Sequence, residues 1–245
     1  MYRLTAADFA DTGQWRLLLK IGNTGLEAFL ENTLHPEIEP QPLCSEKWGL
    51  NKDMLRENIE EAVYKNPRLL DDFATRITLY DTRTMFIPTE IAEKEAGAEE
   101  DIYSEVYSAT SSDIMSDTDR DITAVWSMAP GVKSFLMRTF PGAKISSNLM
   151  ELVKRFRKEA KGLSLFVIAR KEEADLIFLD GHDLISASSH EWKIPDDVAY
   201  LVMNLIDIYK YKFKDIALNV KDLDIDSDAW KFLKSKSRSF NVLTN

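Results

Sequence analysis

The turn Gly22-Asn23-Thr24 is the part of this sequence whose residue types are best suited to chemistry. It follows the apolar run Trp15 to Ile21 and precedes Leu26 to Leu30, where apolar and polar residues alternate, so the stretch predicts a β-hairpin. Glycine lets backbone N–H groups approach an anion closely, and the threonine hydroxyl adds a donor. Gly22, Asn23 and Thr24 are therefore candidate cofactor-binding residues, with phosphate as the ligand.

Two acid-rich segments have the alternating acids of a calcium-binding loop. They are Asp117 to Asp121 and Asp222 to Asp228. Such a loop needs Gly at its sixth position for a sharp turn and a bidentate Glu at its twelfth, and both segments lack both residues. Three histidines and one cysteine in the whole chain also argue against a structural zinc site. We therefore expect no metal ligands.

Serine, histidine and aspartate residues in the second half of the chain can be assembled on paper into a hydrolytic triad. The residues concerned are His182, Asp183, Ser188, Ser189 and His190. No Gly-x-Ser-x-Gly nucleophile elbow surrounds these serines, and polar residues on a half-exposed strand need no catalytic role. We predict no catalytic residue among them.

The net charge of −10 is concentrated in one segment. Thr89 to Asp121 holds eleven acids against Lys94 and Arg120. Affinity for phosphate backbones comes from concentrated Lys and Arg, so this acidity argues against a nucleic-acid partner. The five tryptophans do not lie among basic residues as in a single-strand binder, and we expect them in the core or at its rim.

The composition is that of a globular protein without a membrane span. No stretch approaches ~20 uninterrupted apolar residues, because Asn204 and Asp207 interrupt the longest one, Ala199 to Ile208. The N-terminal residues carry acids and lack the apolar core of a signal peptide, and the one cysteine, Cys44, cannot form an internal disulfide. We expect a cytoplasmic location.

Strands and helices alternate along the chain, and an amphipathic helix that Gly162 ends marks the expected boundary between two domains. The first domain, residues 1–161, is expected to hold several elements after the first hairpin. They are a helix from Asn51 to Pro67, a second hairpin of Arg76 to Tyr80 with Thr84 to Ile87, a short helix at Glu99 to Tyr107, an exposed loop at Ser108 to Asp121, a strand at Ile122 to Met128, a helix from Pro130 to Pro141, a short strand at Ala143 to Ser146 and a helix from Leu149.

The second domain, residues 162–245, predicts the element order β-β-β-α-β-α-β, with the first three strands as a meander. The strands are Leu163 to Ala169, Leu176 to Leu179, Leu184 to Ser188, Ile216 to Val220 and Phe240 to Leu243, and the helices are Pro195 to Tyr209 and Ser227 to Lys234. The first helix carries the clearest apolar stripe of the chain. Its members are Val198, Leu201, Val202, Leu205, Ile206 and Tyr209.

This element order is similar to the ribonuclease H-like units of the actin, sugar kinase and Hsp70 superfamily. The chain more closely resembles a bacterial family of unknown function with an actin-like ATPase fold, through the segments Leu79 to Ile91, Phe135 to Ile145 and Leu163 to Leu218, the last including Ser189 to Tyr200. The resemblance implies an α/β protein with two ribonuclease H-like units of mixed sheet plus helices.

The resemblance also implies three nucleotide motifs, which this chain keeps poorly. The first is Asp-x-Gly-x-Ser/Thr; Gly22 and Thr24 match it, but Lys20 replaces the acid that organises Mg²⁺, and a fixed positive charge repels the metal. The second motif falls at Lys171 to Ala174, which has no glycine, and the adenosine motif falls at Asn219 to Asp222, where a glycine pair is absent. No cofactor is therefore expected.

The leading hypothesis is a non-catalytic actin-like scaffold or interaction protein with a protein partner, whose surface is the acidic loop or the cleft between the domains. One alternative is a nucleotide-dependent kinase or ATPase that uses a relocated acid, with Asp175 and Asp180 as the candidates. Another is a small-molecule sensor that binds in the cleft without turnover.

Overall fold

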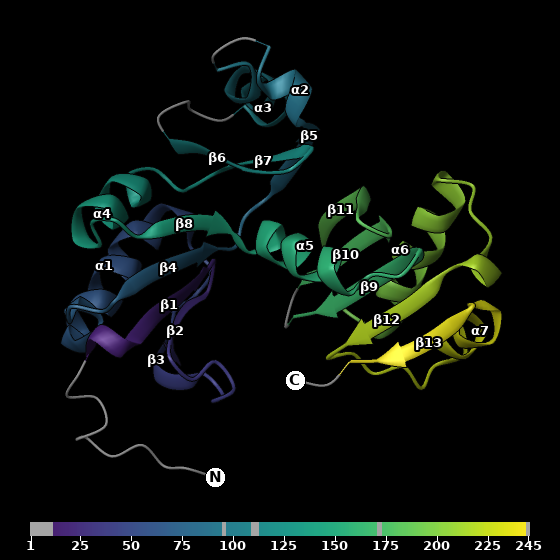
Figure 1. Ribbon diagram of the computed structural model, residues 1–245, viewed down its shortest axis with the longest axis horizontal. Helices are drawn as coiled ribbons and strands as arrows, with labels where there is room; N and C mark the ends of the chain where they lie inside the picture. Colours follow the sequence, from purple (N-terminus) through teal and green to yellow (C-terminus); the bar gives the residue numbers. More distant parts are fainter. Residues whose placement is uncertain (1–11, 95–96, 109–112, 171–172, 244–245) are drawn as a thin grey trace. The chain divides into compact units, whose positions relative to one another are not determined.

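The computed structural model describes residues 12–94, 97–108, 113–170 and 173–243 (Figure 1). The chain divides into two compact units, Met1–Asn148 and Leu149–Asn245. This division falls at the start of helix α5 (Asn148–Glu159), whereas the sequence patterns place the boundary after that helix, so the two divisions assign α5 to different units. None of the helices in the described part is long and apolar enough to cross a membrane.

The first unit is built on a five-stranded mixed sheet in the order β3-β2-β1-β4-β8. The predicted hairpin is confirmed as β1 (Trp15–Gly22) and β2 (Gly25–Asn32), which pair antiparallel, and β3 (Gln41–Lys47) continues the meander. The strands β4 (Thr75–Tyr80) and β8 (Lys144–Ser147) run parallel to β1. The carboxyl ends of β1, β4 and β8 therefore lie at one edge of the sheet.

Helices cover the face of this sheet on which alternate residues of β1 are buried. Helix α1 (Leu55–Lys65) contacts β2 and also α4 (Val132–Thr139). Asn51 caps a short 3-10 turn (Lys52–Met54) before α1, because its side-chain oxygen accepts the N–H of Asp53 at 3.1 Å. Two further 3-10 turns are at Thr12–Gln14 and Pro67–Leu70.

A three-stranded sheet in the order β5-β7-β6 is inserted between β4 and β8. The predicted strand β5 (Thr84–Pro88) exists, but it pairs with β7 (Ile122–Ser127), so the prediction of a hairpin between β4 and β5 is wrong. Helices α2 (Thr89–Ala92) and α3 (Ala98–Tyr107) follow β5 and pack on this sheet.

The prediction of an exposed loop at Ser108 to Asp121 is also wrong for its described part. Residues Ile114–Asp119 form β6, an edge strand antiparallel to the buried strand β7. Ser, Asp and Thr occupy the polar positions of this edge, where charged side chains are common, and the ladder to β7 outweighs their preference for local hydrogen bonds. Residues 109–112 lie outside the described ranges.

The second unit repeats the strand order of the first. Its sheet is β11-β10-β9-β12-β13, in which β9 pairs antiparallel with β10 and parallel with β12. The strands, which confirm the predicted meander and its two later strands, are β9 (Leu163–Ala169), β10 (Glu173–Asp180), β11 (Asp183–Glu191), β12 (Ala217–Lys221) and β13 (Ser239–Val242). The two sheets thus have the same topology, which is a duplication within the chain.

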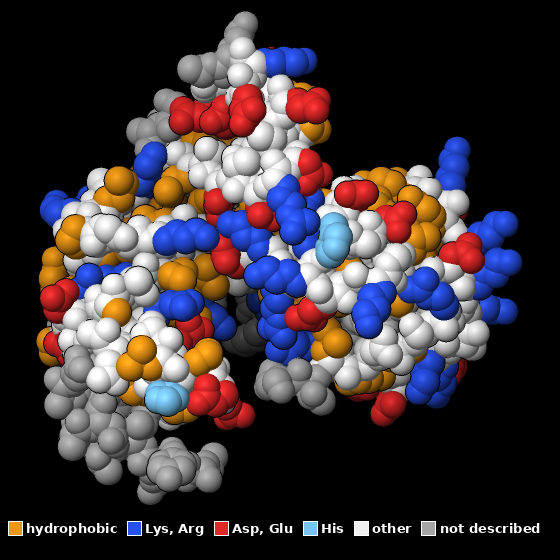
Figure 2. All heavy atoms as spheres, viewed as in Figure 1, with side chains coloured by type: hydrophobic (Ala, Val, Ile, Leu, Met, Phe, Trp, Pro, Cys, Tyr) orange, Lys and Arg blue, Asp and Glu red, His pale blue; other side chains and the backbone are white. Residues whose placement is uncertain are grey.

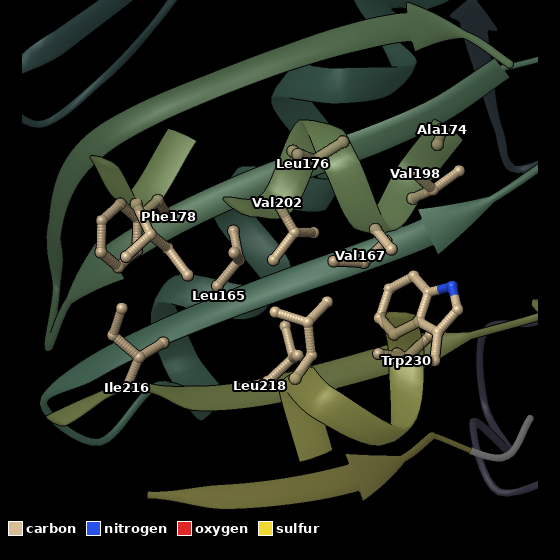
Figure 3. Packing of buried hydrophobic residues seen from close by; sticks show 14 residues of the cluster. Leu165, Val167, Ala174, Leu176, Phe178, Val198, Val202, Ile216, Leu218 and Trp230 are labelled. Carbon is tan, nitrogen blue, oxygen red and sulfur yellow. The ribbon is translucent and has the colours of Figure 1, made fainter. Parts of the chain in front are cut away.

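The core of the second unit lies between this sheet and two helices, α6 (Pro195–Ile208) and α7 (Asp228–Lys236) (Figure 3). Val198, Val202 and Ile206 of the predicted stripe are fully buried, but Tyr209 is 40% exposed because the helix ends before it. Helix α5 covers the other face of the sheet, where the ring of Phe156 stacks on that of Phe166 at 4.2 Å. A 3-10 turn at Phe213–Asp215 precedes β12.

Candidate functional site

The turn between β1 and β2 is a two-residue connection, Asn23-Thr24, flanked by paired glycines. Gly25 is required by close packing, because a Cβ there would lie 2.8 Å from the carbonyl oxygen of Glu46. None of the residues from Gly22 to Gly25 has a positive φ. The turn therefore lacks the left-handed residue with which successive N–H groups form an αR-αL anion nest.

Lys20 lies on the solvent-exposed face of β1, in the place where the resemblance implies an acid. It is exposed, it pairs across the sheet with Glu27, and its Nζ lies 5.1 Å from the centroid of the Phe29 ring. Opposite charges in cross-strand pairs and an ammonium over an aromatic face both stabilise a sheet surface. The geometry of Lys20 is thus that of a structural surface residue.

Asp81 is a carboxylate at this turn that the sequence reasoning missed, because Asp81 was assigned to the turn of a hairpin. It follows β4 directly, and its N–H donates to the carbonyl oxygen of Ile21 at 2.8 Å. A Cβ on Gly22 would lie 3.6 Å from Asp81 Oδ2, so the carboxylate sits beside the turn. Burial raises the pKa of the neighbouring Tyr80, and the charge of Asp81 adds to that shift. The available signal was an acid placed directly after a strand that could run parallel to β1.

Lys20 and Asp81 share one face of the sheet. Gly22 lies two residues after Lys20 on β1, so a Cβ on Gly22 would point to the side of Lys20, and it would lie 3.6 Å from Asp81 Oδ2. The edge that would receive a metal therefore carries an ammonium as well as a carboxylate.

A tryptophan donates hydrogen bonds to both carbonyl groups of the turn between β1 and β2. The indole Nε1 of Trp48 donates to the carbonyl oxygen of Asn23 at 3.0 Å, and the backbone N–H of Trp48 donates to that of Thr24, also at 3.0 Å. Trp48 directly follows β3, whose last residue, Lys47, pairs with Gly25.

The second unit holds the corresponding turn in the same way. Trp192 directly follows β11, whose last residue, Glu191, pairs with Glu173 at the start of β10. The indole Nε1 of Trp192 donates to the carbonyl oxygen of Arg170 at 3.0 Å. Lys171 and Glu172 of the expected second phosphate motif lie outside the described residues.

A buried acid adjoins this second turn. Asp175 is fully buried, and its Oδ1 accepts Arg170 Nη2 at 2.8 Å and Ser189 Oγ at 2.5 Å. Arg170 also pairs with Glu173 at 3.1 Å. The other relocated acid considered from the sequence, Asp180, pairs with Leu163 at the opposite end of β10, so it is remote from the turn of its own sheet.

The segment of the expected adenosine motif contains a left-handed backbone position that is occupied by Asp222 and not by glycine. Asp222, which follows β12, has φ +57°, in the left-handed region that glycine adopts most easily. Asn219 is buried, and its Oδ1 accepts Asn241 Nδ2 at 2.8 Å. Its amide is therefore engaged within the sheet.

The serine and histidine residues considered for a hydrolytic triad do not form one in the structure. Ser188 Oγ lies 2.8 Å from His190 Nε2, whereas Ser189 and Asp175 face the opposite side of the sheet. Desolvation lowers the pKa of His190, although the charge of Asp175 opposes that shift. His182 Nδ1 lies 2.6 Å from the carbonyl oxygen of Arg157. The described ranges also contain no group of three or more His, Cys, Asp or Glu residues arranged for a metal.

The comparisons with known proteins agree with this architecture. A family model described as "Protein of unknown function (DUF3822)" matches residues 5–223, and no curated protein sequence matches the chain. A crystal structure from Bacteroides thetaiotaomicron, of a protein with actin-like ATPase fold and unknown function, superposes with a TM-score of 0.80 at 15% identity, over 96% of this chain and 93% of that chain. The PilM-PilN type IV pilus biogenesis complex gives a TM-score of 0.52 at 11% identity, over 94% of this chain and 88% of that chain. These likenesses show an actin-like fold.

Proposed function

Because this chain belongs to the DUF3822 family, whose fold is actin-like and whose function is unknown, we propose its role from the two turns at its sheet edges. It is a non-catalytic actin-like protein of the cytoplasm that acts by contacts with a protein partner. One fold can support many chemistries, so function has to be argued from the site. This site lacks the acid of the first nucleotide motif and the glycines of the other two.

The observation that carries the proposal is the position of Lys20. It lies two residues before Gly22, on the face that Asp81 shares; it pairs across the sheet with Glu27, and its Nζ lies near the ring of Phe29, as in a surface residue. Phosphoryl transfer needs a metal that bridges phosphate oxygens, and an ammonium at the metal's place opposes it electrostatically.

The state of both turns supports the same conclusion. Trp48 and Trp192 satisfy carbonyl groups of the turns from within the protein, and Arg170 is engaged by Asp175 and Glu173. The carbonyl groups of Asn23, Thr24 and Arg170 thus have partners within the protein. A protein of similar fold in the PilM-PilN complex supports a role in assembly, and the lone thiol of Cys44 fits a reducing compartment.

One observation favours the alternative of a nucleotide-dependent kinase or ATPase. Asp81 places a carboxylate beside Gly22, so an acid is present although Lys20 replaces the expected one. In that alternative Asp81 would organise Mg²⁺ in place of the missing acid.

Phosphate release from Mg-ATP separates the two functions. We expect no turnover above the buffer rate in the natural protein, and none in Lys20→Asp, because the segment of the second phosphate motif, Lys171 to Ala174, contains no glycine. Hydrolysis by the natural protein that Asp81→Asn abolishes would establish the ATPase alternative. Lys231→Gln, outside the turn, is the control for non-specific effects of a lost lysine charge.

A further inference from the structure

The segment that follows α6 and one side of α7 form a surface on which lysines alternate with aromatic rings. We call it the lysine patch, and it consists of Lys210, Tyr211, Lys212, Lys214, Phe232 and Lys236. Phe232 is 46% exposed and Tyr211 37%. Lys236 Nζ lies 5.8 Å from the centroid of the Phe232 ring, and Phe213 meets Phe232 edge-on at 6.2 Å. Figure 2 shows blue side chains gathered at this end of the second unit.

The lysines of the patch lack carboxylate partners. Within the described part of the chain, no ion pair involves Lys210, Lys212, Lys214 or Lys236, whereas Lys231, also on α7, pairs with Asp228 at 3.4 Å. Like charges gathered on one surface repel one another, so this arrangement is electrostatically unfavourable until an anionic surface covers it.

Lys210 occupies a backbone position at which glycine is preferred. It has φ +57°, the N–H of Lys210 donates to the carbonyl oxygen of Asp207 at 3.0 Å, and the N–H of Tyr211 donates to that of Ile206 at 3.1 Å. This pattern is a Schellman motif with lysine in the left-handed position that glycine adopts without strain. The Schellman motif ends α6 and leads the chain into the exposed segment Lys210 to Lys212.

The same chain carries a surface of opposite charge. Glu90, Glu93, Glu100, Asp101 and Glu105, on and beside α2 and α3, form what we call the acidic face. None of these carboxylates makes an ion pair within the described ranges, and three apolar side chains emerge beside them. These are Ile91 (39% exposed), Val106 (59%) and Tyr107 (39%). Figure 2 shows the red side chains gathered over α2 and α3.

We propose that the lysine patch of one copy binds the acidic face of a second copy of this chain. This inference rests on the proposed function and names its partner. Each surface carries charged side chains without ion-pair partners beside exposed apolar side chains. Opposite charges around an apolar centre favour a specific protein contact. A lipid headgroup or a nucleic acid would match the lysines of the patch but would leave the acidic face, with Val106 and Tyr107, uncovered. Because the two surfaces differ, the contact is heterologous and can repeat from copy to copy.

Sedimentation velocity of the full chain tests the proposal. In low salt, the weight-average mass should rise above that of one chain between about 5 and about 200 µM protein, and it should return to one chain in about 0.5 M NaCl, where surface charges are screened. Lys212→Glu/Lys214→Glu should remain a single chain throughout. The control Lys193→Glu/Lys231→Glu makes the same change in net charge outside the lysine patch and should associate as the natural protein does.

A mixing experiment distinguishes a specific contact from general charge effects. Asp101→Asn/Glu105→Gln should also be a single chain, but mixed with Lys212→Gln/Lys214→Gln it should give dimers and nothing larger, because each variant keeps one charged surface and the two neutralised surfaces do not attract each other. A single chain at every concentration of the natural protein, or association unaffected by Lys212→Glu/Lys214→Glu, overturns the proposal. The proposal is also overturned if the natural protein does not self-associate but binds phosphatidylserine vesicles or single-stranded RNA, and Lys212→Glu/Lys214→Glu loses that binding. All samples lack nucleotide, so this result and the phosphate-release result can fail independently.

Discussion

The indole N–H of Trp48 donates to the carbonyl oxygen of Asn23 at 3.0 Å, and Trp192 makes the equivalent contact with Arg170 in the second unit. Both tryptophans follow the third strand of their sheet, and both hold the turn between its first and second strands. The duplication thus extends from strand order to an individual side chain. In an actin-like fold these turns would approach phosphates, and here the protein itself holds both.

Removing each indole N–H should destabilise the protein by about 1 kcal/mol, the usual net contribution of one hydrogen bond. Trp48→Phe and Trp192→Phe keep an aromatic ring in place and remove the donor. Their effects should add in the double variant, because the two turns share no partner. Urea unfolding measures these differences, and midpoints unchanged in both single variants would show that the tryptophans do not stabilise the turns.

The two glycines of the first turn should differ in their tolerance of a methyl group. Gly25→Ala places a Cβ 2.8 Å from Glu46 O and should cost about 1–3 kcal/mol through forced backbone movement. Gly22→Ala is the matched control, since its nearest neighbour, Asp81 Oδ2, lies at an ordinary 3.6 Å. Thermal melts of the two variants give the comparison, and equal losses would contradict the packing of β2 against β3.

The apolar stripe of α6 should dominate the stability of the second unit. Ile206 is 2% exposed in the core, so Ile206→Ala should cost about 2–5 kcal/mol. Ile208→Ala makes the same change at a residue that is 62% exposed and should stay within about 0.5 kcal/mol. Similar losses in chemical denaturation would mean that α6 does not lie on its sheet as in Figure 3.

His190 should make the protein less stable as the pH falls. Desolvation lowers its pKa in the folded state, so below the unfolded value of about 6.5 the unfolded chain binds the proton first. Its contribution is complete above that pH and is lost as the pH falls towards the lower folded pKa. His190→Gln should reduce the difference in unfolding free energy between about pH 7.5 and about pH 5.5, and an unchanged difference would exclude His190 as its source.

Local patterns were sufficient to predict the first hairpin, the meander of the second unit and α6. Alternating burial in β1 and helical spacing of Val198, Val202 and Ile206 are properties of adjacent residues. The same patterns could not show which strands pair. The sequence between Tyr80 and Thr84 looks like a hairpin turn, yet β4 and β5 belong to different sheets. Strand β6 was missed because its pairing with β7 outweighs the turn preference of its Ser, Thr and Asp residues.

The candidate site was only partly predictable for the same reason. Gly22, Asn23 and Thr24 form the expected turn, because a hairpin is a local structure. Asp81 and Trp48 reach that turn from positions far along the chain, and the register that brings them there is set by sheet pairing. The equivalence of Trp48 and Trp192 likewise depends on two strand registers, without any similarity in the surrounding sequence.

Calorimetric titration of the natural protein with Mg-ATP tests the central claim most directly. With Lys20 on the face that Asp81 shares, we expect a dissociation constant no tighter than millimolar, which corresponds to a binding free energy of about −4 kcal/mol. Lys20→Asp should not bring the affinity into the micromolar range, because Arg170 at the second turn stays paired with Asp175. Micromolar affinity in the natural protein, weakened by Asp81→Asn or Thr24→Ala, would contradict the account and establish a working nucleotide site.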